Sequence, residues 1–314
     1  MTKEIPEKLI YAIVGPTASG KTEIGVALAL RLGNGEIINC DSVQIYKEIQ
    51  IATAKPSAEE QRGVPHHLLD YVSPETKYTA ADWAQDAAEK IGEIEARGNV
   101  PILVGGTGFY LRALREPFFE SPKTDVRLRE KLAKIKTEKG AEHLHKILRK
   151  VDKASAAKLP PRDYVRTSRA LEVYFQTGKA ISQIQPNRAK PPEFAGRIKI
   201  FALNPPRDVL YQRINQRTEW HFENGLIEEV KFLREKGLPD ETNALGAHGY
   251  RRVCEFLRGE RILESAIEQS KQDVRNYAKR QMSWFRREPN VRWLEGFGDE
   301  PETQEKLWKM IYLE

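Results

Sequence analysis

The chain has 314 residues, of which 40% are hydrophobic and 31% are charged. This balance is ordinary for a folded globular protein and excludes a wholly disordered chain. No apolar run approaches the roughly 20 residues of a membrane-spanning helix, and residues 1–8 lack the pattern of a secretory signal. Cys40 and Cys254 give neither a disulfide framework nor a zinc pattern, so we expect a cytoplasmic protein with no membrane partner. The net charge of +6 favours a polyanionic partner without identifying one.

Short apolar runs alternate with helical patterns in the first part of the chain. Strands are expected at residues 9–14, 36–40 and 100–104, with helices at 22–32 and 82–97. One further strand is expected much later, at 197–203. Buried strands that alternate with helices are typical of a doubly wound parallel sheet. We therefore predict an α/β fold with a P-loop NTPase-like sheet.

The middle of the chain has a different character, because it contains no convincing strand. Helical patterns cover residues 123–139, 142–150 and 164–177, and Asp163 and Gly178 are placed to begin and end the last of them. Residues 186–192 resemble a linker. The C-terminal helices are expected at 207–216, 226–236, 247–257 and 263–287. We predict a core formed by 1–115 and 197–314, interrupted by a helical insertion at 116–196.

A phosphate-binding motif follows the first expected strand and opens the first expected helix. The pattern G-x-x-x-x-G-K-[ST] is matched by Gly15, Pro16, Thr17, Ala18, Ser19, Gly20, Lys21 and Thr22. Glycines let several backbone N–H groups point at one anion, and the helix N-terminus adds positive potential. Lys21 would neutralise phosphate charge, and the Thr22 hydroxyl would bind a magnesium ion. Such a loop predicts a phosphate ligand but not a reaction.

Two other strand ends carry candidate chemistry, because ligands of open parallel sheets lie beyond the carboxyl ends of the strands. Asp41 follows the second expected strand and could be a general base, a magnesium ligand or a loop cap. Gly105, Gly106 and Thr107 follow the third, where the glycines indicate either a close approach to a ligand or a tight turn. No aspartate stands there, which counts against an ATP-driven motor.

Several basic residues suit phosphate without proving it. Arg213 and Arg217 are four residues apart on an expected helix, and Arg166 and Arg169 are one turn apart on another. A further face, formed by Lys271, Arg275 and Lys279, could bind phosphate or simply be solvated. For the adjacent His66 and His67 a loop or packing role is favoured over a metal site.

Motifs along nearly the whole chain resemble those of the tRNA dimethylallyltransferase family of bacterial type. Beyond the phosphate loop, their order is specific. They are residues 41–46 (DSVQIY), 53–56 (TAKP), 64–70 (VPHHLLD), 101–108 (PILVGGTG), Arg166 with 169–173 (RALEV), 177–178 (TG), 277–281 (YAKRQ) and 284–286 (WFR).

The resemblance implies dimethylallyl diphosphate as donor, magnesium as cofactor, and the adenosine 3′ of the tRNA anticodon as acceptor, alkylated on N6. It implies that Asp41 is the general base, that Thr107 lies in the reaction channel, and that Arg217 binds phosphate with Lys21 and Thr22. The tRNA anticodon stem-loop would meet two sets of residues, one around the base and one in the insertion. They are Asp41, Ser42, Val43 and Gln44, and Val165, Arg166, Thr167, Ser168 and Arg169. A monomer is expected.

The sequence departs from the family pattern at several positions. Ala52 replaces a glycine, His221 a methionine, and Val274 a threonine. His248 takes an isoleucine position, and Arg251-Arg252 replace Lys-Glu. None removes a candidate catalytic group, and together they predict a divergent member. The alternatives are a P-loop kinase of a small metabolite, an adenine-nucleotide prenyltransferase, and a non-catalytic RNA-binding protein; the helical insertion and the basic charge favour tRNA.

Overall fold

A computed structural model describes residues 9–119, 122–186 and 190–312, without the side chain of His248. It divides into two compact units. The first, called the core, joins Met1–Arg115 to Pro192–Glu314, and the second, the insertion, is Glu116–Pro191. None of the described helices is long and apolar enough to cross a bilayer.

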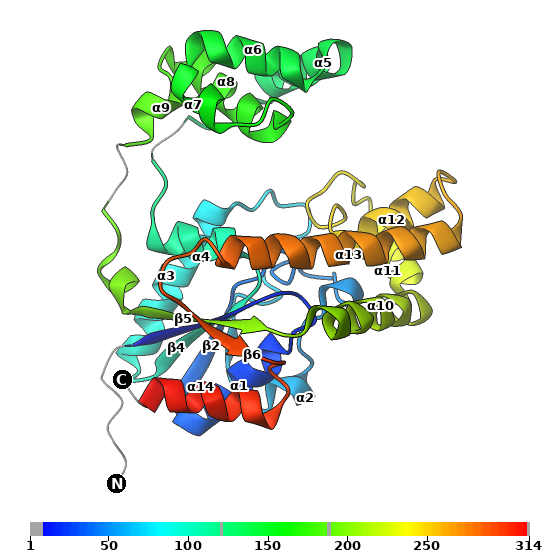
Figure 1. Ribbon diagram of the computed structural model, residues 1–314. Coiled ribbons are helices and arrows are strands. Elements are labelled where there is room, and N and C mark those ends of the chain that lie inside the picture. The colour runs from blue at the N-terminus through cyan, green and yellow to red at the C-terminus, as the bar shows by residue number, and fades with distance from the viewer. Residues whose placement is uncertain (1–8, 120–121, 187–189, 313–314) are drawn as a thin grey trace. The chain divides into compact units, whose positions relative to one another are not determined.

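The core is built on a sheet of six parallel strands (Figure 1). Its order is β3-β2-β4-β1-β5-β6. The strands are β1 (Ile10–Val14), β2 (Gly35–Asn39), β3 (His66–His67), β4 (Val100–Gly105), β5 (Ile198–Asn204) and β6 (Val291–Glu295). Because β2, β4 and β1 are neighbours, the loops that leave their carboxyl ends meet at one edge. The predicted α/β fold is confirmed.

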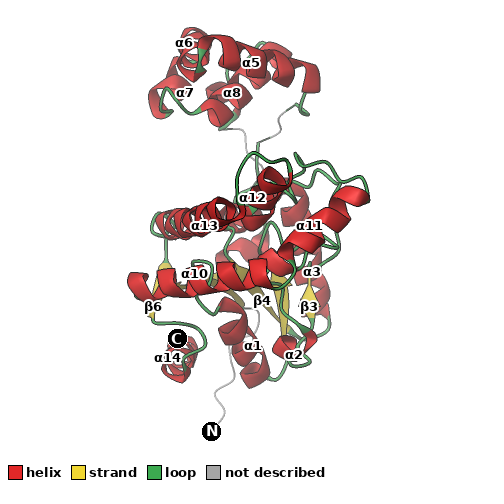
Figure 2. Cartoon of the chain, turned by 90° about the vertical axis from the view of Figure 1, so that its right-hand side faces the viewer, coloured by secondary structure: helices red, strands yellow, loops and turns green. Residues whose placement is uncertain are grey.

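Helices cover both faces of the sheet, and alternate residues of β1 show why. Ile10, Ala12 and Val14 join the larger hydrophobic cluster, whereas Tyr11 and Ile13 join a second cluster on the opposite face. The larger cluster contains residues of α3 (Ala80–Ala96), α4 (Gly108–Arg115), α11 (Leu226–Glu235), α12 (His248–Leu257) and α13 (Leu263–Phe285). The second contains residues of α1 (Lys21–Leu32) and α14 (Pro301–Tyr312), which lie together below the sheet in Figures 1 and 2.

Some elements of the core were not expected. The strands β3 and β6 are absent from the prediction, as are α14, the short α2 (Ala58–Gln61) and α4. The expected helix at 207–216 continues to Glu223 as α10 (Arg207–Glu223), so Arg217 and His221 both lie within this helix. His66 and His67 form β3, and His67 Nε2 lies 2.5 Å from Glu36 Oε2, so His67 has a structural partner within the sheet. His66 Nδ1 lies 2.8 Å from the Val64 carbonyl.

The insertion is helical, as predicted. It contains α5 (Val126–Lys139), α6 (Ala141–Val151), α7 (Lys153–Lys158), α8 (Tyr164–Thr177) and α9 (Ile181–Ile184). Its own apolar cluster includes Leu144, Leu148 and Leu171, all 0% exposed. Asp163 caps α8 by accepting from the Arg166 N–H at 3.0 Å, and Gly178 ends that helix with φ +70°.

The second boundary of the insertion differs from the prediction. It falls at Pro191 instead of residue 196. Residues Glu193–Arg197 form a short 3₁₀ helix that leads into β5, and Phe194 packs against the larger core cluster. The sequence signal of a strand begins only at residue 197, so the sequence places this turn in the insertion, whereas it belongs to the core. The expected linker at 186–192 lies partly outside the described residues.

Candidate functional site

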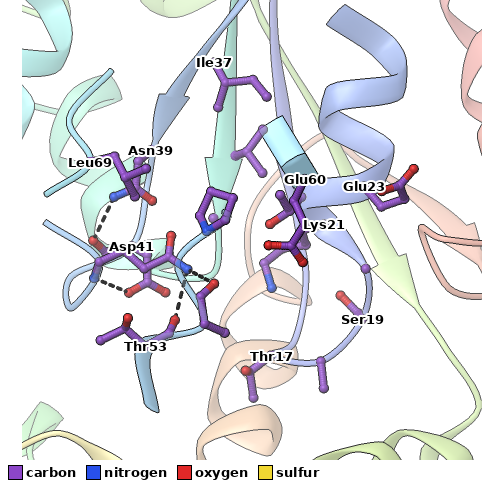
Figure 3. A pocket seen from close by; sticks show the side chains of 18 of the residues that line it. Thr17, Ser19, Lys21, Glu23, Ile37, Asn39, Asp41, Thr53, Glu60 and Leu69 are labelled. Carbon is purple, nitrogen blue, oxygen red and sulfur yellow. Dashed lines mark hydrogen bonds between the residues drawn. The ribbon is translucent and has the colours of Figure 1, made fainter. Parts of the chain in front are cut away.

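A cavity of about 560 Å³ opens at the carboxyl ends of β1, β2 and β4, and we call it the donor pocket after the donor that the sequence resemblance implies. It brings together the phosphate loop after β1 and Asp41 after β2, as Figure 3 shows. Among the lining residues are Thr17, Ser19, Lys21, Thr22, Asp41, Gln44, Thr53, Arg213 and Arg217. The motif and the carboxylate, 19 or more residues apart in sequence, therefore share one site.

The phosphate loop has the geometry of an anion cradle. Gly15 and Gly20 have φ of +145° and +81°, values that L side chains adopt only under strain. Within the described part of the chain, the N–H groups of residues 18–20 donate to no acceptor. The buried Ser19 hydroxyl also lacks a partner there. Free donors of this kind at a helix N-terminus suit a phosphate group.

Lys21 lies at the floor of the donor pocket and donates to the Pro16 carbonyl at 2.7 Å. Burial lowers the pKa of this ammonium to about 8, Asp41 opposes the shift, and Arg217 adds to it. Such a lysine is still cationic at neutral pH, but it loses its charge in mildly alkaline solution.

This titration predicts how donor affinity depends on pH. A diphosphate favours the protonated lysine, so affinity is full below about pH 8 and falls as the pH rises above it, by up to about tenfold per unit. Calorimetry with a non-hydrolysable donor analogue from pH 7 to 9.5 measures this, because an alkyl phosphate is already ionised above about pH 7. The Lys21→Met variant is the control. A fall of equal slope in that variant would assign the effect to another group.

The phosphate loop is held in shape by Gln281 of α13. Its Oε1 accepts from the Thr17 N–H at 2.8 Å, and its Nε2 donates to the Gly106 carbonyl at 3.0 Å. Gln281 is only 4% exposed, and a Cβ on Gly106 would lie 2.0 Å from its amide nitrogen. The glycine after β4 therefore admits a side chain that ties the phosphate loop to the β4–α4 turn. This link was not foreseen from the sequence.

Replacing Gln281 tests the link. Gln281→Leu preserves the volume but leaves the Thr17 N–H and the Gly106 carbonyl without partners, which costs about 1–3 kcal/mol for each buried group. We expect a lower melting temperature and a larger rise in KM for the donor than for the acceptor, since one orphaned group belongs to the phosphate loop. Steady-state kinetics with each substrate varied, beside thermal melts, provide the check. Equal rises in both KM values would contradict this role.

A second brace comes from the loop between β6 and α14. The Gly298 N–H donates to the Ser19 carbonyl at 2.8 Å, and Asp299 accepts from Arg213 at 2.9 Å. A Cβ on Gly20 would meet the Asp299 backbone nitrogen at 2.7 Å. Arg213, which was paired with Arg217 as a phosphate ligand, thus has an acidic partner of its own beside the pocket.

Asp41 begins the turn that follows β2. Its Oδ1 accepts from the N–H groups of Val43 and Gln44 at 2.9 and 3.3 Å. No described residue hydrogen-bonds Oδ2. Asp41 can therefore cap the loop with Oδ1 and still act as a general base or magnesium ligand with Oδ2. The side-chain amide of Gln44 donates to the carbonyls of Thr53 and Ala54 at 3.0 and 2.8 Å. Its side-chain carbonyl oxygen therefore remains available to accept a hydrogen bond from a ligand.

Thr107 connects the turn after β2 to the turn after β4. Its Oγ1 accepts from the Ser42 N–H at 3.0 Å and lies 3.3 Å from the Ser42 hydroxyl. Thr107, Ser42, Val43 and Tyr277 line a larger cavity of about 690 Å³, which we call the outer pocket. Burial raises the pKa of Tyr277, and its phenol hydrogen-bonds Thr107. The Tyr277 hydroxyl therefore stays protonated at neutral pH.

Arg217 reaches the phosphate loop from α10 and donates to the Thr17 hydroxyl. Burial lowers the pKa of its guanidinium, whereas Asp41 raises it. It lines the donor pocket with Lys21, so two cations face the space where an anion would bind. The arrangement can stabilise negative charge that develops on a leaving group.

The residues around Thr22 fit magnesium only in company with a phosphate ligand. The Thr22 hydroxyl and the Asp41 carboxylate line the same pocket. Among the described residues there is no cluster of three acidic, histidine or cysteine side chains that could hold a metal. Magnesium usually takes one or two protein ligands and completes its shell with substrate phosphates and water. The Thr22 hydroxyl and the Asp41 carboxylate match this usual number of protein ligands for magnesium.

Comparisons with known proteins identify the chain's family. A family model described as IPP transferase matches residues 44–288. The chain belongs to the IPP transferase family. A tRNA dimethylallyltransferase of Koribacter versatilis is 45% identical over 298 residues, covering 94% of this chain and 95% of the relative.

Solved structures of this family resemble the chain over nearly its whole length. A full-length tRNA isopentenylpyrophosphate transferase of Bacillus halodurans is 38% identical with a TM-score of 0.71, covering 98% of this chain and 95% of its own. A eukaryotic dimethylallyltransferase acting on tRNA is 29% identical with a TM-score of 0.73, covering 91% and 73%. IPP transferase membership therefore rests on sequence and structure together.

The insertion of this IPP transferase does not present all the expected tRNA-binding residues. Val165 is 76% exposed, and Arg166 is exposed while it pairs with Asp163. Thr167 and Ser168 are buried, at 0% and 5% exposure. Buried hydroxyls cannot reach an RNA backbone, so assigning these two to the RNA surface is corrected. Their positions fall on the apolar face of α8.

Arg169 has a structural partner in the same insertion. It lies 3.2 Å from Glu172, which is 0% exposed, and it donates to the Pro122 carbonyl at 2.9 Å. Glu172 is also paired with Arg129. A substitution of Arg169 therefore disturbs a buried carboxylate, and Arg166 is the cleaner probe of RNA contact.

Two of the three basic residues expected to form a face on α13 have partners within the core. Lys271 is 8% exposed and bonds Glu219 at 2.6 Å, and Arg275 donates to Asn215. Lys279 is exposed, with its ammonium 6.0 Å from the Tyr211 ring. The structure therefore does not present a continuous phosphate-binding face formed by Lys271, Arg275 and Lys279.

Proposed function

We propose that this IPP transferase moves the dimethylallyl group of dimethylallyl diphosphate to N6 of the adenosine 3′ of a tRNA anticodon. The observation that carries the proposal is a chain of cavities. The donor pocket and a small cavity share Thr17, Asp41 and Arg217. The small cavity and the outer pocket share Val43 and Tyr277. A diphosphate and a base that enter from opposite ends would therefore meet beside Asp41.

The chemistry assigns a step to each end of this passage. The N6 nitrogen of adenine forms a bond to C1 of the allylic donor, and the C1–O bond breaks with its electron pair leaving on diphosphate. Asp41 Oδ2 accepts the proton that N6 loses, which matters because the amine lone pair is delocalised into the ring. The phosphate-loop N–H groups, Lys21 and Arg217 meet the charge that develops on diphosphate. Magnesium, held by Thr22 and phosphate oxygens, would supply further charge neutralisation.

The acceptor side uses the turn after β2 and the residues around Thr107. The Gln44 carbonyl oxygen is available to accept a hydrogen bond from an adenine amine. Thr107 and the protonated Tyr277 hydroxyl form a polar rim on the outer pocket. An adenine must leave the stack of the anticodon loop to reach this depth, as other base-modifying enzymes require of their substrates. Arg166 and Val165 of the insertion would hold the stem-loop.

The test is incubation of the protein with unmodified tRNA, magnesium and dimethylallyl diphosphate, followed by mass spectrometry of the released nucleosides. We expect N6-dimethylallyladenosine in tRNAs that carry adenosine 3′ of the anticodon. Free AMP replaces tRNA in a second arm, and ATP replaces the donor in a third. Prenylated AMP without prenylated tRNA would indicate the nucleotide prenyltransferase instead, and transfer of phosphate from ATP would indicate a kinase.

A further inference from the structure

A cavity of about 40 Å³ lies between the donor pocket and the outer pocket. Its inner wall is formed by side chains from three parts of the core that are far apart in sequence. They are Ala52, His221, Phe222, Leu226 and Val274, with the backbone of Gly249. Phe222, Leu226 and Val274 are 8%, 0% and 9% exposed. A methyl on Gly249 would lie 3.0 Å from Leu226 Cδ2 and 3.7 Å from Ala52 Cβ, so this end of the cavity is closely packed.

The opposite end of the cavity is polar, because Thr17, Asp41 and Arg217 belong to it and to the donor pocket. A ligand that occupies both spaces would place its anion among cations and its other end against the inner wall. That is the polarity of an alkyl diphosphate, with a charged head and a hydrocarbon tail.

The inner wall carries no charge at neutral pH. His221 is 8% exposed, and burial together with nearby Arg217 lowers its pKa to about 4. The imidazole is therefore neutral at neutral pH. Thr218, beside it, donates its hydroxyl to the Ile214 carbonyl at 2.8 Å. Neither group offers a counter-ion, so the wall suits hydrocarbon better than a second anion.

We propose that the inner wall receives the branched end of the donor's alkyl chain and that Ala52 and His221 limit the chain to five carbons. This inference rests on the proposed function. A volume of about 40 Å³ leaves room for a small branched group and for little more. A ten-carbon allylic chain would collide with His221 and Ala52.

The experiment compares dimethylallyl diphosphate with its ten-carbon homologue, geranyl diphosphate, on one tRNA. His221→Ala opens the wall, and we expect the kcat/KM ratio of the ten-carbon to the five-carbon donor to rise by about tenfold or more. His221→Met keeps the wall filled and should preserve the wild-type ratio. Glu223→Ala is the matched control, since this residue of α10 is exposed and does not line the cavity.

A filling substitution gives the reciprocal test. Ala52→Leu should lower kcat/KM for the five-carbon donor by about tenfold or more, while inhibition by inorganic diphosphate stays within about twofold of wild type, because the head group binds elsewhere. An unchanged donor ratio in His221→Ala, or an Ala52→Leu enzyme that uses the five-carbon donor normally, would overturn the inference while the proposed function stands. A wild-type protein that prenylates no tRNA with either donor would instead overturn the proposed function, and this inference with it.

Discussion

Asp41→Asn is expected to lower the rate of prenyl transfer by about 10²–10⁴-fold, the usual effect of losing a general base. The substitution is nearly isosteric. The asparagine oxygen can still accept from the N–H groups of Val43 and Gln44, so the turn after β2 keeps its shape. What is lost is the second carboxylate oxygen, which would take the proton from N6. Binding of tRNA should therefore change by no more than a few-fold.

The measurement is a single-turnover rate at saturating donor, beside filter binding of tRNA. Saturation matters because Asp41 raises the pKa of Lys21, and its removal makes that lysine easier to deprotonate. The assay is best run at pH 7 for the same reason. Asp240→Asn is a suitable control, since Asp240 pairs with Arg234 and Arg258 on a different part of the core. A near-normal single-turnover rate in Asp41→Asn would show that Asp41 shapes the turn after β2 and does not accept the proton from N6.

Much of the fold could be predicted because its signals are local. β1 and β4 are continuous apolar runs, and the glycines that follow them mark where the chain must turn. The elements that were missed have weak local signals. In β6 only Leu294 is buried, and β3 has only two residues, so neither gives a recognisable run. Helix α14 reads as charged surface, although Leu307 and Ile311 pack against the sheet.

The site was predictable only as far as its residues belong to motifs. The phosphate loop and Asp41 stand at strand ends, where parallel sheets bind ligands. Gln281 ends the motif at 277–281, but its role is not predictable from that motif, because the role depends on a contact with Gly106, 175 residues earlier in the chain. The burial of Thr167 and Ser168 is predictable from the sequence. Helical spacing puts them on the same face as Ala170 and Leu171, and that face is buried in the insertion.

Alanine substitutions of Arg217 and Arg166 are expected to affect different substrates, the donor for Arg217 and tRNA for Arg166. Arg217 contacts Thr17 of the phosphate loop, so Arg217→Ala should raise KM for dimethylallyl diphosphate and lower kcat by about 10²–10³-fold. The dissociation constant for tRNA should stay within a few-fold. Arg217→Lys restores charge without the guanidinium fork and should recover only part of the rate.

Arg166→Ala should weaken tRNA and leave donor binding in the absence of tRNA unchanged. Its guanidinium is exposed on the insertion, where its pairing with Asp163 can be exchanged for a phosphate. If it contacts one phosphate, the slope of log K against log salt should fall by about 0.7–0.9. A base contact would instead cost about 1–3 kcal/mol with little change in slope. Filter binding of an anticodon stem-loop across a salt series distinguishes the two. Wild-type tRNA affinity in Arg166→Ala, with an unchanged melting temperature, would remove this arginine from the RNA-binding surface.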